Sequence, residues 1–311
     1  MGRPVLIDTD AGVDDALALI LALRSPELDI RAITTVAGNV PVHMCTRNVK
    51  AILDQLNADS GLVVAQGAAK PLVRRLVTAP EVHGRDGFGN VRPKKRTSRM
   101  TSPVPAERVI AVACREWGKK LTIIALGPLT NIAKALKRYP RSLKKVGRII
   151  TMGGAFRVQG NTGPVAEFNY YVDPEAAQAV LSSGIPITVI PLDLTQQIAI
   201  MHSELERRAH RRANQLSQLI VRMTRFYMQY HRDTEHFFGG FLHDPIAVAA
   251  AIRPSLFQTQ RLRVEIETEG TFTRGMSIAD FRRKESRKGV NVALKFEKEQ
   301  FLKLFHERLW E

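Results

Sequence analysis

Apolar, β-branched runs alternate along most of the chain with stretches in which apolar residues recur at helical spacing. Each run predicts a strand, and two of the intervening helices are predicted over Val13 to Arg24 and Val42 to Leu56. Strands that alternate with helices are typical of a parallel sheet with helices on its faces. We therefore predict an α/β fold with a Rossmann-like, open and mostly parallel sheet flanked by helices. The predicted strands are Val5 to Thr9, Ile30 to Val36, Leu62 to Ala65, Leu121 to Leu126, Arg148 to Met152 and Pro186 to Ile190.

The last third of the chain departs from this alternation. A long helical region is predicted from about Ser203 to His231, followed by a Gly239-Gly240 loop. Arg261 to Glu267 alternates apolar and polar residues, and Val290 to Phe296 predicts a last strand before a closing helix. These segments predict extra β structure toward the C-terminus. Because no linker or repeat interrupts the chain, we predict one domain over residues 1–311.

The composition, with 44% apolar residues, is that of an ordinary globular protein and argues against disorder or membrane spans. No secretory signal is visible, so we expect a cytoplasmic protein. Cys45 and Cys114 are too few for a disulfide framework and lack metal-site spacing, which predicts two reduced, structural thiols. The formal net charge is +16, but the basic clusters lack the interleaved aromatic residues that stack bases, so we do not expect nucleic acid as a partner.

Four aspartates, Asp8, Asp10, Asp14 and Asp15, fall within eight residues directly after the first predicted strand. Carboxylates this close repel one another unless some are protonated or a cation shares them, and hard divalent ions prefer oxygen ligands. Asp14 and Asp15 open the next helix and could serve only as caps. Capping does not account for Asp8 and Asp10, although both fall on one side of an extended segment. The cluster therefore predicts a metal-centred active site.

Polar motifs also follow other predicted strands, where open α/β sheets bind their ligands. These motifs are Ala37-Gly38-Asn39, Gly127 to Asn131 and Met152-Gly153-Gly154. Two further segments hold candidate residues, namely His243-Asp244-Pro245 and the loop from Gly160 to Pro174. Each of them could be purely structural when taken alone, because histidines and aspartates often are and polar loops are common. We expect the strand ends to converge on one crevice.

The combination of these motifs resembles the nucleoside hydrolases of the inosine-uridine preferring type, over nearly the whole chain. The segments that carry the resemblance are Asp8-Thr-Asp-Ala-Gly-Val-Asp-Asp15, Thr34-Thr-Val-Ala-Gly-Asn39, Ala125-Leu-Gly-Pro-Leu-Thr-Asn131, Met152-Gly-Gly154, Ala166-Glu-Phe-Asn169 and His243-Asp-Pro245. Two more, His83-Gly-Arg-Asp-Gly87 and Val264 to Thr273, are most similar to the bacterial ribonucleoside hydrolases that accept both pyrimidine and purine nucleosides.

The resemblance implies an enzyme that cleaves the N-glycosidic bond of a ribonucleoside with water, in nucleoside salvage or catabolism, and that binds Ca²⁺ tightly. The implied ligands of the ion are Asp10, Asp15, Asp244 and the backbone carbonyl of Leu126, with Asp8 supporting them from behind. Asp10 would also act as the general base toward the attacking water. The substrate is a small molecule, and no membrane is involved.

The resemblance also implies how the nucleoside is held. The residues implied for the ribose are Asp14, Asn39, Glu167, Asn169 and Asp244, with Asn161 and Met152 lining the pocket. Phe168 and either Tyr230 or His231 would face the base, although helical spacing places some aromatic residues of that stretch in the core. His243, whose ordinary pKa suits neutral pH, is the first candidate to protonate the leaving base, and His83 is the second.

Two positions depart from the family pattern. Ala11 stands where proline is usual, which should loosen the first loop. Asp86 stands where a small hydroxyl residue is commoner, which would alter base preference or loop closure. The family is commonly tetrameric or dimeric, so we expect a homo-oligomer, with a homotetramer as the first choice.

Two other functions compete with this interpretation. An aspartate-nucleophile phosphatase of the haloacid dehalogenase type also begins with Asp-x-Asp after a strand, but Asp14, Asp15 and Asp244 would be superfluous there. A protein that binds nucleosides or nucleic acid without hydrolysing them could share the same fold. A salt-dependent electrophoretic shift without hydrolysis would support that second alternative.

Overall fold

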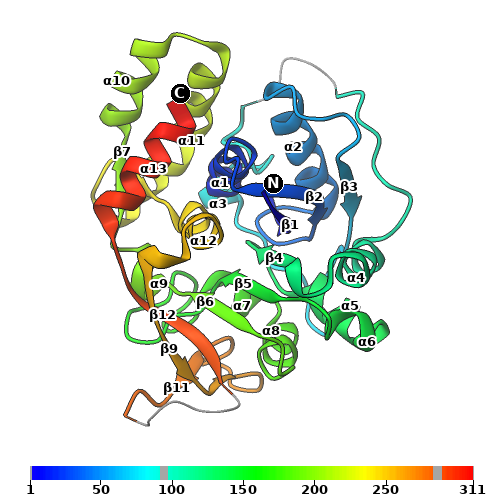
Figure 1. Cartoon of the computed structure of the whole chain (residues 1–311). Coiled ribbons are helices and arrows are strands. Elements are labelled where there is room, and N and C mark those ends of the chain that lie inside the picture. The colour runs from blue at the N-terminus through cyan, green and yellow to red at the C-terminus, as the bar shows by residue number, and fades with distance from the viewer. Residues whose placement is uncertain (1, 92–96, 283–288, 311) are drawn as a thin grey trace.

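The computed structural model describes residues 2–91, 97–282 and 289–310, and its centre is an eight-stranded sheet (Figure 1). In sheet order the strands are β3 (Val63–Gln66), β2 (Leu28–Thr35), β1 (Arg3–Thr9), β4 (Thr122–Ala125), β5 (Arg148–Met152), β6 (Ile187–Ile190), β12 (Val290–Phe296) and β9 (Phe257–Leu262). Neighbouring strands pair in parallel as far as β12, and β9 is antiparallel to β12. The predicted α/β class with a mostly parallel sheet is confirmed.

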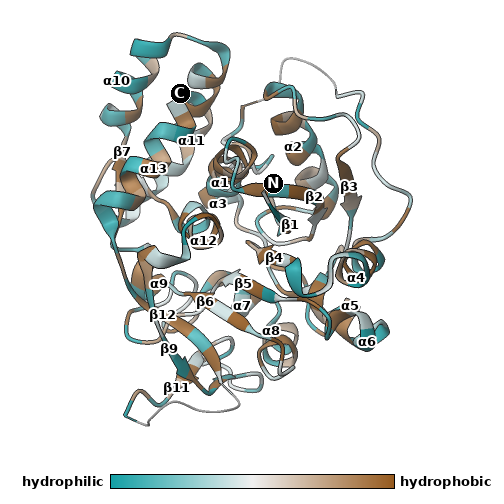
Figure 2. Ribbon diagram, in the orientation of Figure 1, coloured by the Kyte–Doolittle hydropathy of each residue, from teal (hydrophilic) through white to brown (hydrophobic). Residues whose placement is uncertain are grey.

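The helices cover the sheet on both faces because successive strand residues point to opposite sides. In β1, Val5 and Ile7 belong to one buried core, and Leu6 between them belongs to the other. The first core is formed with α1 (Val13–Leu23), α2 (Val42–Gln55), α11 (Gln215–Glu235), α12 (His243–Ile252) and α13 (Lys298–Trp310). The second core is formed with α4 (Ala106–Trp117), α5 (Thr130–Arg138), α6 (Pro140–Leu143) and α8 (Pro174–Leu181). Figure 2 shows the hydrophobic residues concentrated on the strands and on the inward sides of these helices.

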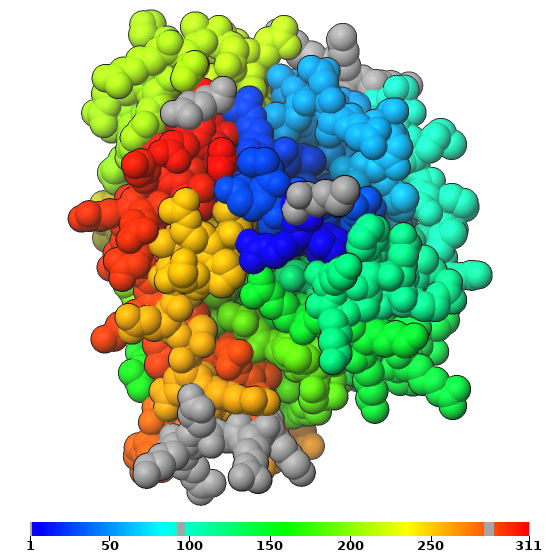
Figure 3. Space-filling model, viewed as in Figure 1, coloured from blue at the N-terminus to red at the C-terminus, as the bar shows by residue number. Residues whose placement is uncertain are grey.

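The closing helix α13 ties the end of the described chain to its beginning. The Arg24 guanidinium, at the end of α1, donates hydrogen bonds to the carbonyls of Arg308 and Leu309 at 3.2 and 2.9 Å. Arg308 in turn pairs with Glu27 at 3.0 Å. Figure 3 shows α13 (red) beside both α12 (amber) and the N-terminal segment (blue) on one face of the molecule. The predicted last strand and closing helix are therefore both present, as β12 and α13.

Three details of the C-terminal third differ from the sequence-based prediction. The long helical region is two helices, α10 (His202–Arg212) and α11, because Ala213 takes a left-handed φ of 43° and Asn214 caps α11 through Ser217 N–H. The predicted strand Arg261 to Glu267 is divided between β9 and β10 (Val264–Ile266), and β10 turns away from the sheet to pair with β11 (Ser277–Ala279). Gly239-Gly240 is not a loop but part of strand β8 (Gly239–Phe241), which pairs with β7 (Ala199–Met201).

Helix α12, next to the crevice, is buried over its whole length, from His243 to Ile252. Its middle is built from alanines, and α1, whose residues are also nearly all buried, packs directly against it. Small side chains allow two helix backbones to approach closely, and an interior packed in this way has no spare volume for added methylene groups. Residues in the first turn of α12 are thus held by the core itself.

We predict that Ala249→Leu lowers the free energy of unfolding by about 1–3 kcal/mol, because the added methylene groups overpack the interface of α12. Ala51→Leu on α2 is the matched control, since Ala51 is only half-buried. Chemical denaturation of both variants measures the difference. Equal losses in the two variants would contradict tight packing around α12.

Candidate active site

The aspartates of the first loop are held by hydrogen bonds that cross the sheet. Asp8 is fully buried, and its Oδ1 accepts from Thr34 Oγ1 at 2.5 Å and from Asn131 Nδ2 at 2.8 Å. Asn131 lies in the first turn of α5, so Asp8 joins β1, β2 and α5. Burial raises the pKa of Asp8 to about 7, because the charged form loses its hydration. This position behind the other carboxylates agrees with the supporting role expected for Asp8.

Asp15 closes the loop that leads into α1. Its Oδ1 accepts a hydrogen bond from the Thr9 hydroxyl, and its Oδ2 accepts from Gly12 N–H at 2.8 Å and Asn39 Nδ2 at 3.1 Å. A carboxylate that accepts from N–H groups in the first turn stabilises a helix start. Asp15 therefore does serve as a helix cap, which is the structural role that the sequence offered as an alternative to metal binding.

Asp10 occupies a space made by two glycines. Its Oδ2 accepts from Asn39 N–H at 2.8 Å, whereas its Oδ1 is buried without a hydrogen-bond partner among the described residues. A Cβ added at Gly38 would lie 2.1 Å from Oδ2, and one added at Gly127 would lie 2.7 Å from Oδ1. Both glycines are therefore required by the close approach of the Asp10 carboxylate. A buried carboxylate oxygen without a protein partner is a position where a ligand is expected.

Asp244, in the first turn of α12, completes the cluster from the far end of the chain. One carboxylate oxygen from each of Asp14, Asp15 and Asp244 lies within 4.8 Å of the others. Burial, followed by the charges of neighbouring aspartates, raises the pKa of Asp10 and Asp244 well above the ordinary range and that of Asp14 to about 8. Asp14, which the sequence assigned to ribose, thus belongs to the same group of carboxylates as the expected metal ligands.

The donors in this cluster fit a hard cation. Besides the carboxylates, the backbone carbonyl of Leu126 faces the same space, where it accepts from Asn169 Nδ2 at 2.8 Å. An all-oxygen set is what Ca²⁺ prefers, with six to eight ligands of which several are usually water or substrate. The unpartnered Oδ1 of Asp10 and the raised pKa values both show that the carboxylates lack a counter-charge of their own. Asp10, Asp15, Asp244 and Leu126 therefore remain suitable ligands.

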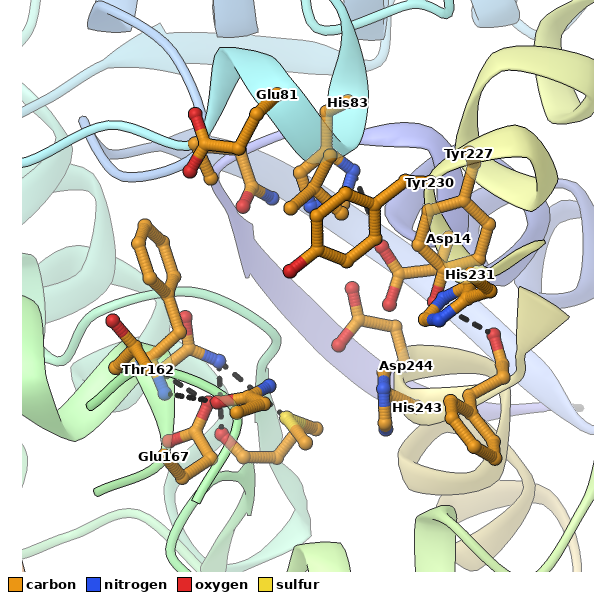
Figure 4. A pocket seen from close by; sticks show the side chains of 18 of the residues that line it. Asp14, Glu81, His83, Thr162, Glu167, Tyr227, Tyr230, His231, His243 and Asp244 are labelled. Carbon is orange, nitrogen blue, oxygen red and sulfur yellow. Dashed lines mark hydrogen bonds and ion pairs between the residues drawn. The ribbon is translucent and has the colours of Figure 1, made fainter. Parts of the chain in front are cut away.

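A cavity of about 270 Å³ lies above this cluster (Figure 4). All residues that the sequence assigned to the substrate line it. They are Asp14, Asn39, Met152, Asn161, Glu167, Phe168, Asn169, Tyr230, His231 and Asp244, together with Leu126, His83 and His243. In Figure 4, Asp14 and Asp244 converge near its centre, with Tyr230 and His231 on one side and Glu167 on the other. The expected convergence of strand ends on one crevice is thus observed.

The polar wall of the cavity is a rigid turn at the start of α7 (Phe168–Val172). Glu167 caps this helix, accepting from the N–H groups of Asn169 at 2.8 Å and Gly154 at 3.1 Å, and burial raises its pKa to about 7. Asn169 Nδ2 also donates to the carbonyl of Met152 at 3.2 Å. Asn161 Oδ1 accepts from Phe168 N–H at 2.9 Å. These bonds fix the side chains in directions suited to adjacent hydroxyl groups of a ligand.

The opposite wall is built from aromatic and imidazole rings. His83 stacks on Tyr227 with ring centroids 5.6 Å apart, and Tyr227 meets His231 edge-on at 4.7 Å. His83 Nδ1 accepts from Val13 N–H at 3.2 Å, which leaves the proton of the neutral ring on Nε2. His243 Nδ1 lies 2.7 Å from Thr195 Oγ1. Tyr230 and His231, which the sequence assigned to the base, both line the cavity.

Burial lowers the pKa of His83 and of His243 to about 3. The sequence-based argument for His243 used the ordinary imidazole pKa, and that part of the argument was wrong. The physical reason is that a buried imidazolium ion loses its hydration and is repelled by the neighbouring histidines. Each ring is therefore neutral near pH 7 and can donate one N–H hydrogen bond.

The first loop also differs from expectation at Ala11. The chain is not loosened there, since Ala11 is fully buried and takes a left-handed φ of 41° that proline cannot adopt. Its N–H donates to Thr9 Oγ1 at 3.0 Å, and its carbonyl accepts from Asn48 Nδ2 at 3.1 Å. Alanine therefore permits a hydrogen bond that the usual proline would remove.

Several residues in or next to the cavity were not singled out in the sequence. Tyr227 lies three and four residues before Tyr230 and His231 on α11, so helical spacing could have grouped all of them on one face. Thr195, the partner of His243, is a single hydroxyl at the end of α9 (Leu192–Thr195) without a motif around it. Glu81, from the short helix α3 (Pro80–His83), and Phe241 likewise carried no signal of their own.

Comparison with known proteins agrees with this geometry. The family model described as inosine-uridine preferring nucleoside hydrolase matches residues 5–303. The chain belongs to this family. A pyrimidine-specific ribonucleoside hydrolase RihA from Citrobacter koseri is 40% identical over 99% of this chain and 98% of its own length. The solved structure of a purine-preferring ribonucleoside hydrolase from Gardnerella vaginalis has a TM-score of 0.93 at 33% identity, covering 99% of this chain and 98% of that one.

A plant nucleoside hydrolase, PpNRh1, is similar to the same extent, with a TM-score of 0.92 and 34% identity over 100% of this chain and 99% of that chain. This nucleoside hydrolase is therefore an enzyme that acts on a small-molecule nucleoside, and the phosphatase alternative is wrong. Among the residues described, none of its helices has both the length and the apolar character needed to cross a membrane.

We predict that the metal-free nucleoside hydrolase loses stability as pH rises from about 4 to about 8. Asp14 has a folded pKa of about 8 against 3.8 as its ordinary value, so the folded state keeps a proton that the unfolded state has lost. For each proton retained in this way, the free energy of unfolding falls by about 1.4 kcal/mol at most for every pH unit in that window. Asp14→Asn should flatten this dependence, because the amide does not titrate.

Chemical denaturation in a chelator at pH 5, 6.5 and 8 would measure the slope. The exposed Asp59 supplies the matched control, Asp59→Asn. The control variant should keep the wild-type dependence of the free energy of unfolding on pH. If Asp14→Asn keeps it as well, Asp14 does not titrate in this window.

Proposed function

We propose that this enzyme hydrolyses the N-glycosidic bond of ribonucleosides to ribose and free base, using a Ca²⁺ ion and one water molecule. The observation that carries the proposal is the buried group of Asp14, Asp15 and Asp244 at a cavity lined with amides and acids, together with Asp10, whose pKa the charges of Asp14 and Asp15 raise. Asp10, Asp15, Asp244 and the Leu126 carbonyl would hold the ion. When bound, Ca²⁺ lowers the pKa of water and supplies the missing counter-charge.

Asp10 would act as the general base. Its Oδ2 is fixed by Asn39 N–H, whereas its Oδ1 has no hydrogen-bond partner among the described residues and can take a proton. A base is effective when its pKa lies closer to the working pH than that of an ordinary carboxylate. In the metal-free protein, burial and the neighbouring carboxylates raise the pKa of Asp10, and a bound cation would bring it back toward the ordinary range.

The acidic surroundings would favour the transition state. As the glycosidic bond breaks, positive charge develops on the ribose ring, and fixed negative charge nearby stabilises it. Asp14, Glu167 and Asn169 line the cavity at the side of the carboxylate cluster and would bind the ribose hydroxyls. Glu167 accepts three backbone N–H bonds, so its oxygens are fixed before the substrate arrives.

The leaving base would lie against the wall of rings. His243 and His83 each present a neutral ring, and the hydrogen bond of His83 with Val13 leaves its Nε2–H as the free donor. Such a donor can stabilise the negative charge that develops on a departing base. His243 stays the first candidate and His83 the second. Tyr230 and His231 offer faces for the base itself.

We infer that both purine and pyrimidine nucleosides are accepted. The relatives with near-complete coverage bear names of both kinds, pyrimidine-specific for RihA and purine-preferring for the Gardnerella enzyme. Stacking on aromatic rings does not depend on the hydrogen-bonding pattern of the base, and this supports a broad choice. We further propose that the protein acts in nucleoside salvage or catabolism, in the cytoplasm, and as a homo-oligomer.

The test of the reaction is release of ribose from inosine, uridine, cytidine, adenosine and xanthosine. We expect turnover of at least one purine and one pyrimidine nucleoside. Asp10→Asn should lower kcat by about 10²–10⁴, because the amide cannot take the proton of water. Absence of turnover with every nucleoside would refute the proposed function.

Metal removal gives an independent prediction. Prolonged dialysis against a chelator should abolish hydrolysis and lower the melting temperature, and added Ca²⁺ should restore both, because an ion that binds only the folded state stabilises it. Metal analysis before and after dialysis identifies the ion. Unchanged activity after complete loss of metal would contradict a role for calcium.

A further inference from the structure

The turn after His83 is closed by one carboxylate. Asp86 Oδ1 accepts from Phe88 N–H at 2.8 Å and from Asn90 N–H at 2.9 Å. Between them, Gly89 N–H donates to the carbonyl of His83 at 2.9 Å. Three successive N–H groups are thereby satisfied, and the middle one fixes the backbone of His83 itself. A serine or threonine hydroxyl makes this kind of local bond more weakly than a carboxylate does.

A second side chain ties this turn to the aspartate loop. Asn48 is fully buried, and its Nδ2 donates to the carbonyl of Asp86 at 2.9 Å and to that of Ala11 at 3.1 Å. The two positions at which this chain departs from its family pattern are thus joined through one amide. Val13 N–H, in the same aspartate loop, donates to the ring of His83 at 3.2 Å.

The turn is also packed from the other side. Phe88 is 1% exposed and belongs to the core beneath it. Gly89 has a positive φ of 66°, and a Cβ there would lie 2.1 Å from the carbonyl oxygen of Met223 on α11. The turn is therefore fixed between α2, which carries Asn48, and α11, which carries Tyr227. Few alternative positions of His83 are compatible with this packing.

We propose that Asp86 is a positioning residue, which with Asn48 fixes the turn 84–90 and so aims the ring of His83 at the leaving base. The inference rests on the proposed function, because it assigns His83 an action on the base. Asp86 itself does not line the cavity and acts only through His83. A misplacement of about 1 Å in such a group can lower the rate by up to about 10²-fold.

The test compares two substrates that differ in their need for a proton on the leaving group. Uridine or inosine needs help at the departing base, whereas a 4-nitrophenyl riboside releases an anion that is stable at neutral pH. Asp86→Ala should lower kcat for the nucleoside about 10–100-fold and leave the 4-nitrophenyl riboside within about threefold. Asp86→Asn keeps an acceptor oxygen and should restore nucleoside turnover to within about threefold of wild type.

Asp59→Ala is the matched control. Asp59 Oδ1 accepts from Gly61 N–H at 2.9 Å in a similar turn, in an exposed position outside the cavity lining, so neither substrate should be affected. Thermal unfolding confirms that each variant is folded. Asp86→Ser, which keeps a shorter acceptor for the nearer N–H, replaces Asp86→Ala if the latter does not fold, and a smaller loss confined to the nucleoside is expected.

Equal losses on both substrates, no loss on either, or an Asp86→Asn variant as slow as Asp86→Ala would each overturn the proposal. These results are distinct from failure of the proposed function. In that case, the wild-type enzyme itself would hydrolyse neither the nucleosides nor the 4-nitrophenyl riboside.

Discussion

Several buried carboxylates cannot all carry charge in one small volume without a cation, and this constraint shapes the whole site. Asp10, Asp14, Asp15 and Asp244 are almost fully buried, and burial raises the pKa of each. Protonation relieves the repulsion in the absence of an ion, and a divalent cation would relieve it more completely. The same crowding that destabilises the metal-free protein provides the negative field required by a cationic sugar.

The scaffold resists this repulsion through bonds that join separate elements. Asp8 is held by residues of β2 and α5, and Asp244 stands on a helix that is buried over its whole length. Asn131, which donates to Asp8, also accepts from Ala68 N–H at 2.8 Å, so the segment after β3 is tied to the same point. Carboxylates held on such rigid elements cannot move apart to reduce their repulsion. A cation that bound between them would relieve this repulsion, which favours its binding.

The sheet and the polar centre of the site could be predicted from the sequence, because each depends on residues that are close together in the chain. Parallel strands buried on both faces are continuous apolar runs, so β1, β5 and β6 were predicted to within a residue or two. The aspartates were found because several acidic residues directly after a buried strand are rarely needed for folding alone. Breaks set by single residues were missed, such as Ala213 between α10 and α11, since an isolated alanine carries no turn signal.

The ring wall was predicted only in part. The rings of this wall come from α3, α11 and β8. A local sequence pattern does not predict which residues of such distant elements will be in contact. The lowered pKa of His243 shows the same limit, because burial is a property of the assembled fold. The role of Asp86 and Asn48 became visible only when their hydrogen-bond partners were known.

The location of Asp244 on α12 has a consequence for how the protein is made. During synthesis the N-terminal aspartates leave the ribosome long before α12, so the nascent chain would hold only part of the proposed set of ligands. Strong capture of the proposed ion would have to wait until α12 has packed against α1, a contact between distant parts of the chain. Ion uptake would then mark the end of folding, and prematurely terminated chains would compete poorly for calcium.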